Sequence, residues 1–215
     1  FRIPADKSPE DCQVEEIALR ASSGVVLVGE NSHLQFRNII VQNFWNDGYN
    51  LHGSSNDIFF ENIAALYNGD DGISAHGTCE FNLKNFLSVG NSNGICHIND
   101  AIAVHENVYI ADSAGRDLYM LNSKNIFRNV LVKGNSAGGV EFGSDKKETD
   151  EKSENILENC FFHGLLASNR LVQTKKTKLS GKNVKSFAWQ FSGKNTPEFW
   201  EYLEDFAQFD AVSSA

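Results

Sequence analysis

An asparagine that recurs at nearly constant spacing is the feature that most constrains the fold of this chain. Successive copies are separated by 24, 23, 22, 22 and then 30 residues, at Asn38, Asn62, Asn85, Asn107, Asn129 and Asn159. A self-similar period of this length indicates a repeat architecture, in which each unit buries its apolar face only by stacking on copies of itself. The 215 residues are therefore expected to form a single solenoid domain, residues 1–215.

Apolar and polar residues alternate on both sides of each asparagine. Phe60 lies two positions before Asn62, and Ile63 and Ala65 lie one and three positions after it. Alternation with period two is typical of a β-strand. A second strand per repeat is predicted from inward-facing residues 11 and 13 positions after the asparagine: Tyr49 and Leu51, Ile73 and Ala75, Cys96 and Ile98, Leu118 and Met120, Val140 and Phe142.

At least two short strands per repeat, with an asparagine at a fixed turn, predict an all-β fold. We expect a right-handed parallel β-helix of 22–24-residue coils over about residues 17–192. The leucine spacing and helical half of a leucine-rich repeat are absent from the sequence. Stacked asparagine side chains are expected to hydrogen-bond from coil to coil. The charged run 145–154 is expected to loop out of the stack.

A C-terminal helix over about residues 197–209 is expected to cover the last coil. Thr196 suits the N-cap and Pro197 the first helical position, and Phe199 and Leu203 fall on one side of such a helix. The open end of a solenoid needs a cover of this kind.

Composition excludes several classes of protein. A net charge of −9 without a long basic stripe argues against nucleic acid as a partner. No run of about 18 apolar residues is present, so no membrane span is expected. Cys12, Cys79, Cys96 and Cys160 lack CxxC spacing, so no zinc site is predicted.

The chain begins with Phe1 rather than Met, which we interpret as a processed or truncated start. The oligomeric state stays open.

Two similar stretches, NDGYNLHG from Asn46 and GDDGISAHG from Gly69, contain candidate functional residues. Asp-Gly alone is ordinary turn chemistry. Residues between the inward positions should point outward, because side chains alternate across a strand. One face of neighbouring coils is therefore expected to gather Asp47, Asp70, Asp71, Asn50, His52, His76, His97, Arg116, Asp117, Tyr119 and Glu141. Folding seldom requires such a set, which indicates a functional site.

The stretch from Asn46 to Gly77 resembles polygalacturonase-type glycoside hydrolases of the pectin-lyase-like superfamily, in which an NTDG motif precedes a DD pair by about one coil. By that resemblance Asp47 matches the first acid, and Asp70 and Asp71 match the pair. The resemblance implies an inverting site with carboxyl groups about 6.5–9.5 Å apart, which neighbouring coils about 4.8 Å apart can supply.

The chain differs from that family further along. The family's GHG and RIK motifs are replaced here by Ser92-Asn93-Gly94 and by Leu118-Tyr119-Met120. The resulting hypothesis is a hydrolase of polysaccharides that needs no cofactor and is secreted, periplasmic or at the cell surface. Its expected catalytic residues are Asp47, Asp70, Asp71, His76 and His97, and its expected substrate-binding residues are Asn50, His52, Arg116, Tyr119 and Glu141.

Two alternative functions stay open on the same face. Polysaccharide lyases and C5-epimerases of this fold remove the C5 proton with a base, a role for which His76, His97 or Tyr119 would serve. Some such lyases hold calcium with carboxylates, and a cluster of His and Asp could hold a transition metal. The other alternative is a non-catalytic β-helix that binds glycans or has a structural role. Trp45 and Tyr67 could stack on sugar rings in any of these cases.

Overall fold

The computed structural model describes residues 22–134, 139–143, 153–164, 170–173, 177–187 and 190–192. Every element in this part of the chain is a β-strand. One sheet contains β1 (Val25–Gly29), β3 (Tyr49–Gly53), β5 (Asp71–His76), β7 (Asn93–Ile98), β9 (Arg116–Leu121), β11 (Gly139–Gly143), β13 (Arg170–Gln173) and β16 (Gln190–Ser192). The other contains β2 (Ser32–Gln42), β4 (Asn56–Leu66), β6 (Glu80–Val89), β8 (Ile102–Ala111), β10 (Lys124–Gly134), β12 (Ser153–Gly164), β14 (Thr177–Lys182) and β15 (Lys185–Phe187).

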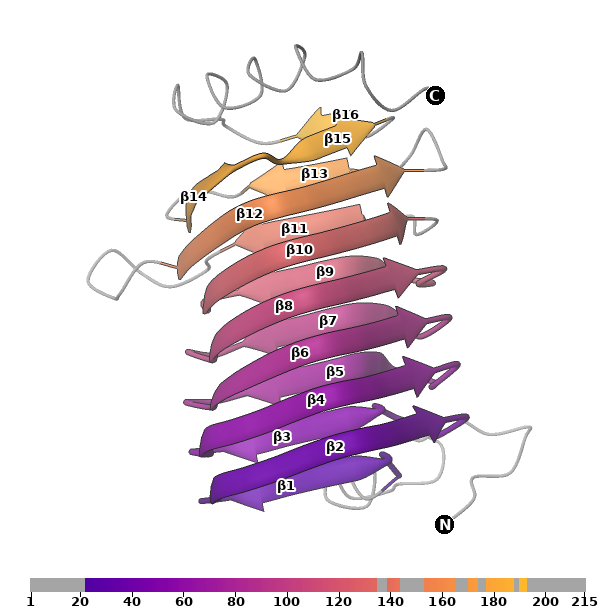
Figure 1. Cartoon of the computed structure of the whole chain (residues 1–215), viewed down its shortest axis with the longest axis vertical. Coiled ribbons are helices and arrows are strands. Elements are labelled where there is room, and N and C mark those ends of the chain that lie inside the picture. The colour runs from indigo at the N-terminus through magenta and orange to yellow at the C-terminus, as the bar shows by residue number, and fades with distance from the viewer. Residues whose placement is uncertain are drawn as a thin grey trace, which may run out of the picture.

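The two sheets wind into a right-handed parallel β-helix. The chain runs along a long strand, returns along a short strand behind it, and rises by one coil each time (Figure 1). Each strand pairs in parallel with its equivalent in the neighbouring coil, for example β3 with β5 and β4 with β6. The predicted all-β fold and parallel β-helix are confirmed. The predicted helix at 197–209 lies outside the described residues, as does the charged run apart from residues 153–154.

The recurring asparagine marks a bend within each long strand. Its φ lies between 51° and 58° in every coil from Asn38 to Asn183, a left-handed conformation that asparagine tolerates better than most residues. The Asn62 amide donates to Asn38 Oδ1 at 3.1 Å, and the same bond repeats in each later coil up to Asn183. The predicted ladder is confirmed, and Asn183 extends it by one coil beyond the repeats found in the sequence.

Apolar side chains from both sheets fill the space inside the coils. Tyr49, Phe60 and Ile73 have no exposed surface, and Phe60 packs edge-on against Tyr49. Buried residues are three positions apart across the asparagine, at Phe60 and Ile63, because the strand bends there. None of the described residues belongs to a helix long and apolar enough to cross a membrane.

The predicted inward positions are confirmed in β3, β5, β9 and β11 and are wrong in β7. Ile73 pairs with Ile95, and Ala75 pairs with His97, so Ile95 and His97 are the residues of β7 that point inward. The cause is a shorter turn. Asn91 precedes Ile95 by four positions, whereas Asn68 precedes Ile73 by five. Removing one residue before a strand exchanges its inner and outer side chains.

Candidate functional site

The Asp-Gly pair recurs because the chain enters β3 and β5 with no room for an inward side chain. A Cβ on Gly48 would lie 2.7 Å from the carbonyl oxygen of Gly72 and 2.8 Å from the Cβ of Ala65. A Cβ on Gly72 would meet oxygen atoms at 2.4 and 2.5 Å. The glycines are thus architectural. The acids just before them, Asp47 and Asp71, are not required by this steric constraint.

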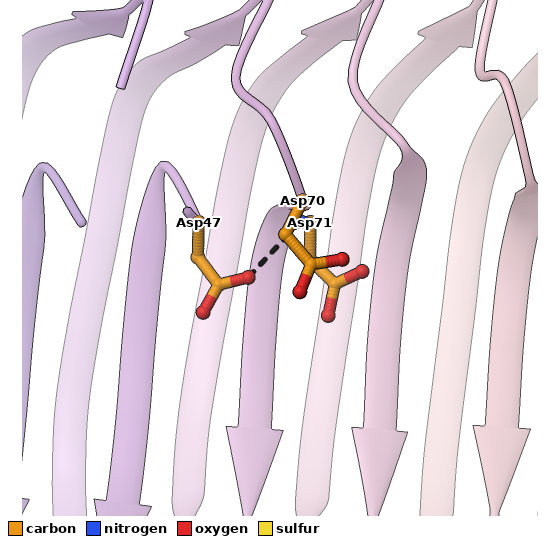
Figure 2. A group of neighbouring side chains, drawn as sticks. All are labelled: Asp47, Asp70 and Asp71. Carbon is orange, nitrogen blue, oxygen red and sulfur yellow. Dashed lines mark hydrogen bonds between the residues drawn. The ribbon is translucent and has the colours of Figure 1, made fainter. Parts of the chain in front are cut away.

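Three carboxylates come together at the start of β3 and β5. One oxygen each of Asp47, Asp70 and Asp71 lies within 4.8 Å of the others (Figure 2). Asp47 and Asp71 are buried, with 2% and 4% of their surface exposed, whereas Asp70 is exposed. These oxygens are closer than the about 6.5–9.5 Å separation expected of an inverting pair. The carboxyl separation that the resemblance implies is therefore not found between these atoms.

Hydrogen bonds fix the two buried carboxylates. Asp47 Oδ1 accepts from the backbone N–H of Asp71 at 3.0 Å, as the dashed line in Figure 2 marks. Asp47 Oδ2 accepts from the Asn50 amide. Asp71 Oδ1 accepts from the Asn93 amide at 2.7 Å. Asn50, predicted to bind substrate, is only 3% exposed and instead positions Asp47. Asn93 was not predicted, because only the shortened turn aligns it with Asp71.

Burial and mutual repulsion raise the proton affinity of the cluster. Burial is the main cause that raises the pKa of Asp47 from 3.8 to about 8, and the charges of Asp71 and Asp70 add to it. Burial, followed by the charge of Asp70, raises the pKa of Asp71 to about 7. Burial also raises the pKa of Asp70. Near neutral pH the cluster therefore holds a protonated acid beside a carboxyl group that titrates.

A second polar group lies further along the same face. The Arg116 Nε donates to Glu141 Oε2 at 2.8 Å, and its guanidinium carbon lies 4.3 Å from the centre of the Tyr119 ring. The backbone N–H of Arg116 donates to Asn93 Oδ1 at 2.7 Å, which connects this group to Asp71 through Asn93. The structure thus brings together three of the predicted substrate-binding residues.

Two histidines stack on the outer side of β3 and β5. The rings of His52 and His76 lie 4.4 Å apart and nearly parallel, at 7°. His76 Nε2 lies 2.7 Å from the Ser74 hydroxyl, which fixes the orientation of the ring. The predicted outward position of both histidines is confirmed, since both are partly exposed.

The predictions that His97 and Asp117 join this outer face are wrong. Asp117 has no exposed surface and lies level with Gly72 of β5. His97 is fully buried, its Nδ1 lies 2.7 Å from Asn125 Oδ1, and its ring centre lies 5.0 Å from that of His105. Burial lowers its pKa to about 4. Cys96 occupies the outer position instead, in line with Ser74. His105, two positions before a ladder asparagine, is buried as well.

The carboxylate cluster has the donor atoms of a site for a hard cation. Ca²⁺ prefers carboxylate and carbonyl oxygens, and Asp47, Asp70 and Asp71 provide three carboxylates from two coils. Across the described ranges, no group of three or more metal-binding side chains that lie this close includes a histidine or cysteine. The geometry therefore fits calcium better than a His-based transition-metal site.

Comparison of the chain with protein-family models, curated proteins and solved structures finds no match. The function must therefore be inferred from the chemistry of the site, because a fold alone does not define an activity. The likeness to polygalacturonase-type hydrolases stays a prediction that rests on the residues between Asn46 and Gly77.

Proposed function

We propose that this chain hydrolyses glycosidic bonds of a polysaccharide, with its acid–base chemistry on Asp47, Asp70 and Asp71. The observation that carries the proposal is the compact cluster of these acids, in which burial raises the pKa of all three and charge repulsion adds to it at Asp47 and Asp71. Glycoside hydrolysis needs one carboxylic acid that protonates the leaving oxygen and one carboxylate that activates water. A cluster that holds protons near neutral pH supplies both forms side by side.

The exposure of the three acids suggests a division of roles. Asp70 is exposed and is the acid that can approach a substrate, whereas Asp47 and Asp71 lie beneath it and keep a proton available. In the proposed reaction the leaving oxygen gains a proton from the cluster. Water adds its hydroxyl to the sugar carbon and gives its remaining proton to an ionised carboxylate of the same cluster, which restores the starting state.

A glycan would lie along the coils, across the outer side of the short strands. Arg116, with Tyr119, lies two strands beyond Asp71, a distance of roughly 10 Å at the usual spacing. Trp45 and Tyr67 are exposed by 48% and 61% on the turns that precede the acids, and their rings could stack on sugars. The proposal also implies a location where polysaccharides occur, outside the cytoplasm, at the cell surface or in the periplasm.

Single Asp-to-Asn substitutions test this proposal. We expect Asp70→Asn, and separately Asp47→Asn and Asp71→Asn, to lower turnover by roughly 10²–10⁴-fold, the usual effect of losing acid–base catalysis. Asp112→Asn is the matched control, because Asp112 is an exposed acid on a turn of another coil. The assay measures new reducing ends and ultraviolet absorbance over a panel of polysaccharides.

Other outcomes of the same assay would contradict hydrolysis. Full activity in all three Asp variants would remove the acids from the mechanism. An unsaturated, absorbing product would favour elimination with His76 or Tyr119. Glycan binding without any turnover, by a chain whose fold is verified by circular dichroism, would favour a non-catalytic role.

Calcium binding is a second function that the cluster supports. Bound at Asp47, Asp70 and Asp71, calcium would supply a positive charge that stabilises a uronate carboxylate during elimination. The test is thermal unfolding with CaCl₂ and, separately, MgCl₂. Calcium at about 100 times its Kd stabilises a fold by about 2.7 kcal/mol, and we expect Asp70→Asn to weaken this shift whereas Asp112→Asn leaves it intact. An equal shift in both variants would place the calcium elsewhere.

A further inference from the structure

Positive and negative charges are distributed unequally between the two sheets in the coils around the acids. Within residues 22–134, which extend from one coil before β3 to two coils beyond β5, Arg116 is the one lysine or arginine outside the long strands. The others lie on β2, β6 and β10 and are Arg37, Lys84, Lys124, Arg128 and Lys133. The acids on the short strands and turns of the same range are Glu30, Asp47, Asp70, Asp71, Asp100, Asp112 and Asp117. The side of the coils that holds the proposed site is therefore negative.

The one cation of this side is already balanced by an acid. Arg116 Nε donates to Glu141 Oε2 at 2.8 Å. Charge repulsion from neighbouring acids also contributes to the raised pKa of Asp47 and Asp71. A substrate carboxylate that approached the cluster would add a further like charge, and the field of this side of the coils would oppose its approach.

An exposed tryptophan lies beside the exposed acid of the cluster. The backbone N–H of Gly69 donates to the Phe44 carbonyl at 2.8 Å, and that of Asp70 donates to the Asn46 carbonyl at 3.3 Å. These bonds set Trp45 level with Gly69, the residue next to Asp70. A Cβ on Gly69 would collide with the Trp45 carbonyl, so the turn of one coil rests directly on the turn of the next.

A tyrosine lies on the same turn as that acid, and the following coil holds its ring. Tyr67 precedes Asp70 by three residues. A Cβ on Gly90 would collide with Cδ1 and Cε1 of Tyr67, so the ring lies against bare backbone there. Both Tyr67 and Trp45 are nevertheless exposed. Aromatic rings presented in this way suit packing against the apolar C–H face of a sugar ring, a contact that requires no charge on the sugar.

We propose that this site takes a neutral polysaccharide and discriminates against polymers of uronic acid. The inference rests on the hydrolase proposed above and names its substrate class. It also favours hydrolysis over elimination, because a neutral sugar lacks the carboxylate that makes the C5 proton acidic. Attraction to the substrate then comes from the aromatic side chains, and charge provides the selectivity.

Matched polymers in two charge states test the substrate class. Polygalacturonate and alginate are each assayed at neutral pH beside the same polymer after its carboxyl groups have been reduced to alcohols, together with xylan, dextran and β-glucan. We expect cleavage of neutral polymers, with kcat/KM roughly tenfold or more above that of a charged polymer at low salt. Sodium chloride should raise turnover of a charged polymer, because it screens the repulsion, and should leave that of a neutral polymer unchanged.

Two glutamate variants test whether charge is the cause. Glu141→Gln removes the acid that pairs with Arg116, and it should raise kcat/KM for a charged polymer, relative to a neutral one, by roughly threefold or more. Glu61→Gln is the matched control, because Glu61 Oε2 pairs with Arg37 Nε at 3.2 Å on the long strands. The control should leave the ratio unchanged. A charged polymer that remains as poor a substrate in Glu141→Gln as in the unsubstituted chain contradicts the charge argument.

The same assays separate a failure of this inference from a failure of the hydrolase. Faster cleavage of a charged polymer than of its reduced form at low salt overturns the substrate class and leaves hydrolysis intact. Cleavage of a uronate polymer that requires CaCl₂ and gives an absorbing product overturns both.

If no polymer is cleaved, the hydrolase proposal fails and binding decides the ligand class. Electrophoresis of the unsubstituted chain through gels that contain the same polymers measures binding. Retardation by neutral polymers alone supports the inference. Retardation by the charged polymers, or by none, overturns it.

Discussion

Two pairs of histidines lie in neighbouring coils, and their environments are opposite. His52 and His76 stack at 4.4 Å on the outer side of β3 and β5, partly exposed, with the Ser74 hydroxyl 2.7 Å from His76. His97 and His105 lie 5.0 Å apart inside the coils and are fully buried. The same residue type thus serves a surface in one pair and the apolar interior in the other.

The difference between the pairs shows how strongly a solenoid depends on turn length. His76 and His97 belong to adjacent short strands, yet a turn shorter by one residue before β7 reverses the direction of His97. Reversal carries an energetic consequence, because a buried imidazole must stay neutral. Burial lowers the pKa of His97 to about 4 and that of His105 well below its usual value.

The largest effect is expected from a charge placed in the inner pair. His97→Glu should lower the free energy of unfolding by roughly 3–5 kcal/mol, because none of the buried residues in the described ranges is a lysine or arginine that could pair with the new carboxylate. His76→Glu is the matched outer variant and should change it by about 0.5 kcal/mol or less. Urea unfolding measures both. Equal losses in the free energy of unfolding would mean that His97 and His76 have the same environment, which would contradict the contrast between the inner and outer pairs.

Acid should destabilise the inner pair selectively. The unfolded chain protonates His97 near pH 6.5, whereas the folded chain does so only near pH 4. The free energy of unfolding is therefore highest, as far as His97 is concerned, above pH 6.5. It falls by about 3 kcal/mol through His97 alone as the pH decreases to about 4. Asp47 and Asp71 act in the opposite direction, because their raised pKa values cost stability as the pH rises from 3.8.

Because the acids and the histidines have opposite effects, the contribution of the histidines is measured as the difference in the free energy of unfolding between two chains. Unfolding is followed over this pH range for the unsubstituted chain and for the double variant His97→Leu, His105→Phe. As the pH falls, the free energy of unfolding of the double variant should increasingly exceed that of the unsubstituted chain. A constant gap would show that neither imidazole titrates on unfolding.

A smaller, stabilising effect is expected from His105→Phe at neutral pH. His105 stacks on Phe127 at 4.6 Å, and neither of its ring nitrogens has a hydrogen-bond partner among the residues that the structure describes. Phenylalanine keeps the stack and removes the unsatisfied nitrogens, which should add about 1 kcal/mol. A chain of this size then melts about 2–4 °C higher. His52→Phe, the outer counterpart, should leave the melting temperature unchanged, and a lower melting temperature for His105→Phe would contradict the argument.

The smallest effect on stability is expected at His76, where activity should change instead. His76→Ala should shift the free energy of unfolding by no more than about 0.5 kcal/mol. Because the sequence predicts a catalytic role for His76 beside the acids, this substitution should lower turnover of the proposed hydrolase at least roughly tenfold, the equivalent of about 1.4 kcal/mol. His33→Ala is the control, since His33 is an exposed histidine on β2 away from the acids. Unchanged turnover in His76→Ala would separate the outer pair from the site.

Local patterns predicted most of the fold and part of the site. The asparagine ladder, the inward Tyr49 and the outward His76 follow from spacing and alternation. The meeting of Asp47 with Asp71 could be expected because their motifs lie one coil apart. The contact of Asn93 with Asp71 and the inward direction of His97 could not be predicted. Both depend on one residue missing from the turn before β7, and the spacing of the asparagines does not show where in the repeat that residue is missing.

The sequence by itself determined that this chain stacks coils, because the asparagine turn and the alternating strands are local features that each repeat contains in full. Only the tertiary structure decided that polar side chains such as Asp47, Asn50 and His97 became buried, and how tightly the buried acids and histidines hold protons. Those properties arise from neighbours about one coil away. Burial, and after it the charges of Asp71 and Asp70, raises the pKa of Asp47, and Asn125 forms a hydrogen bond with His97. Burial depends on the chain that surrounds a residue, and the stacking of separate coils supplies that chain.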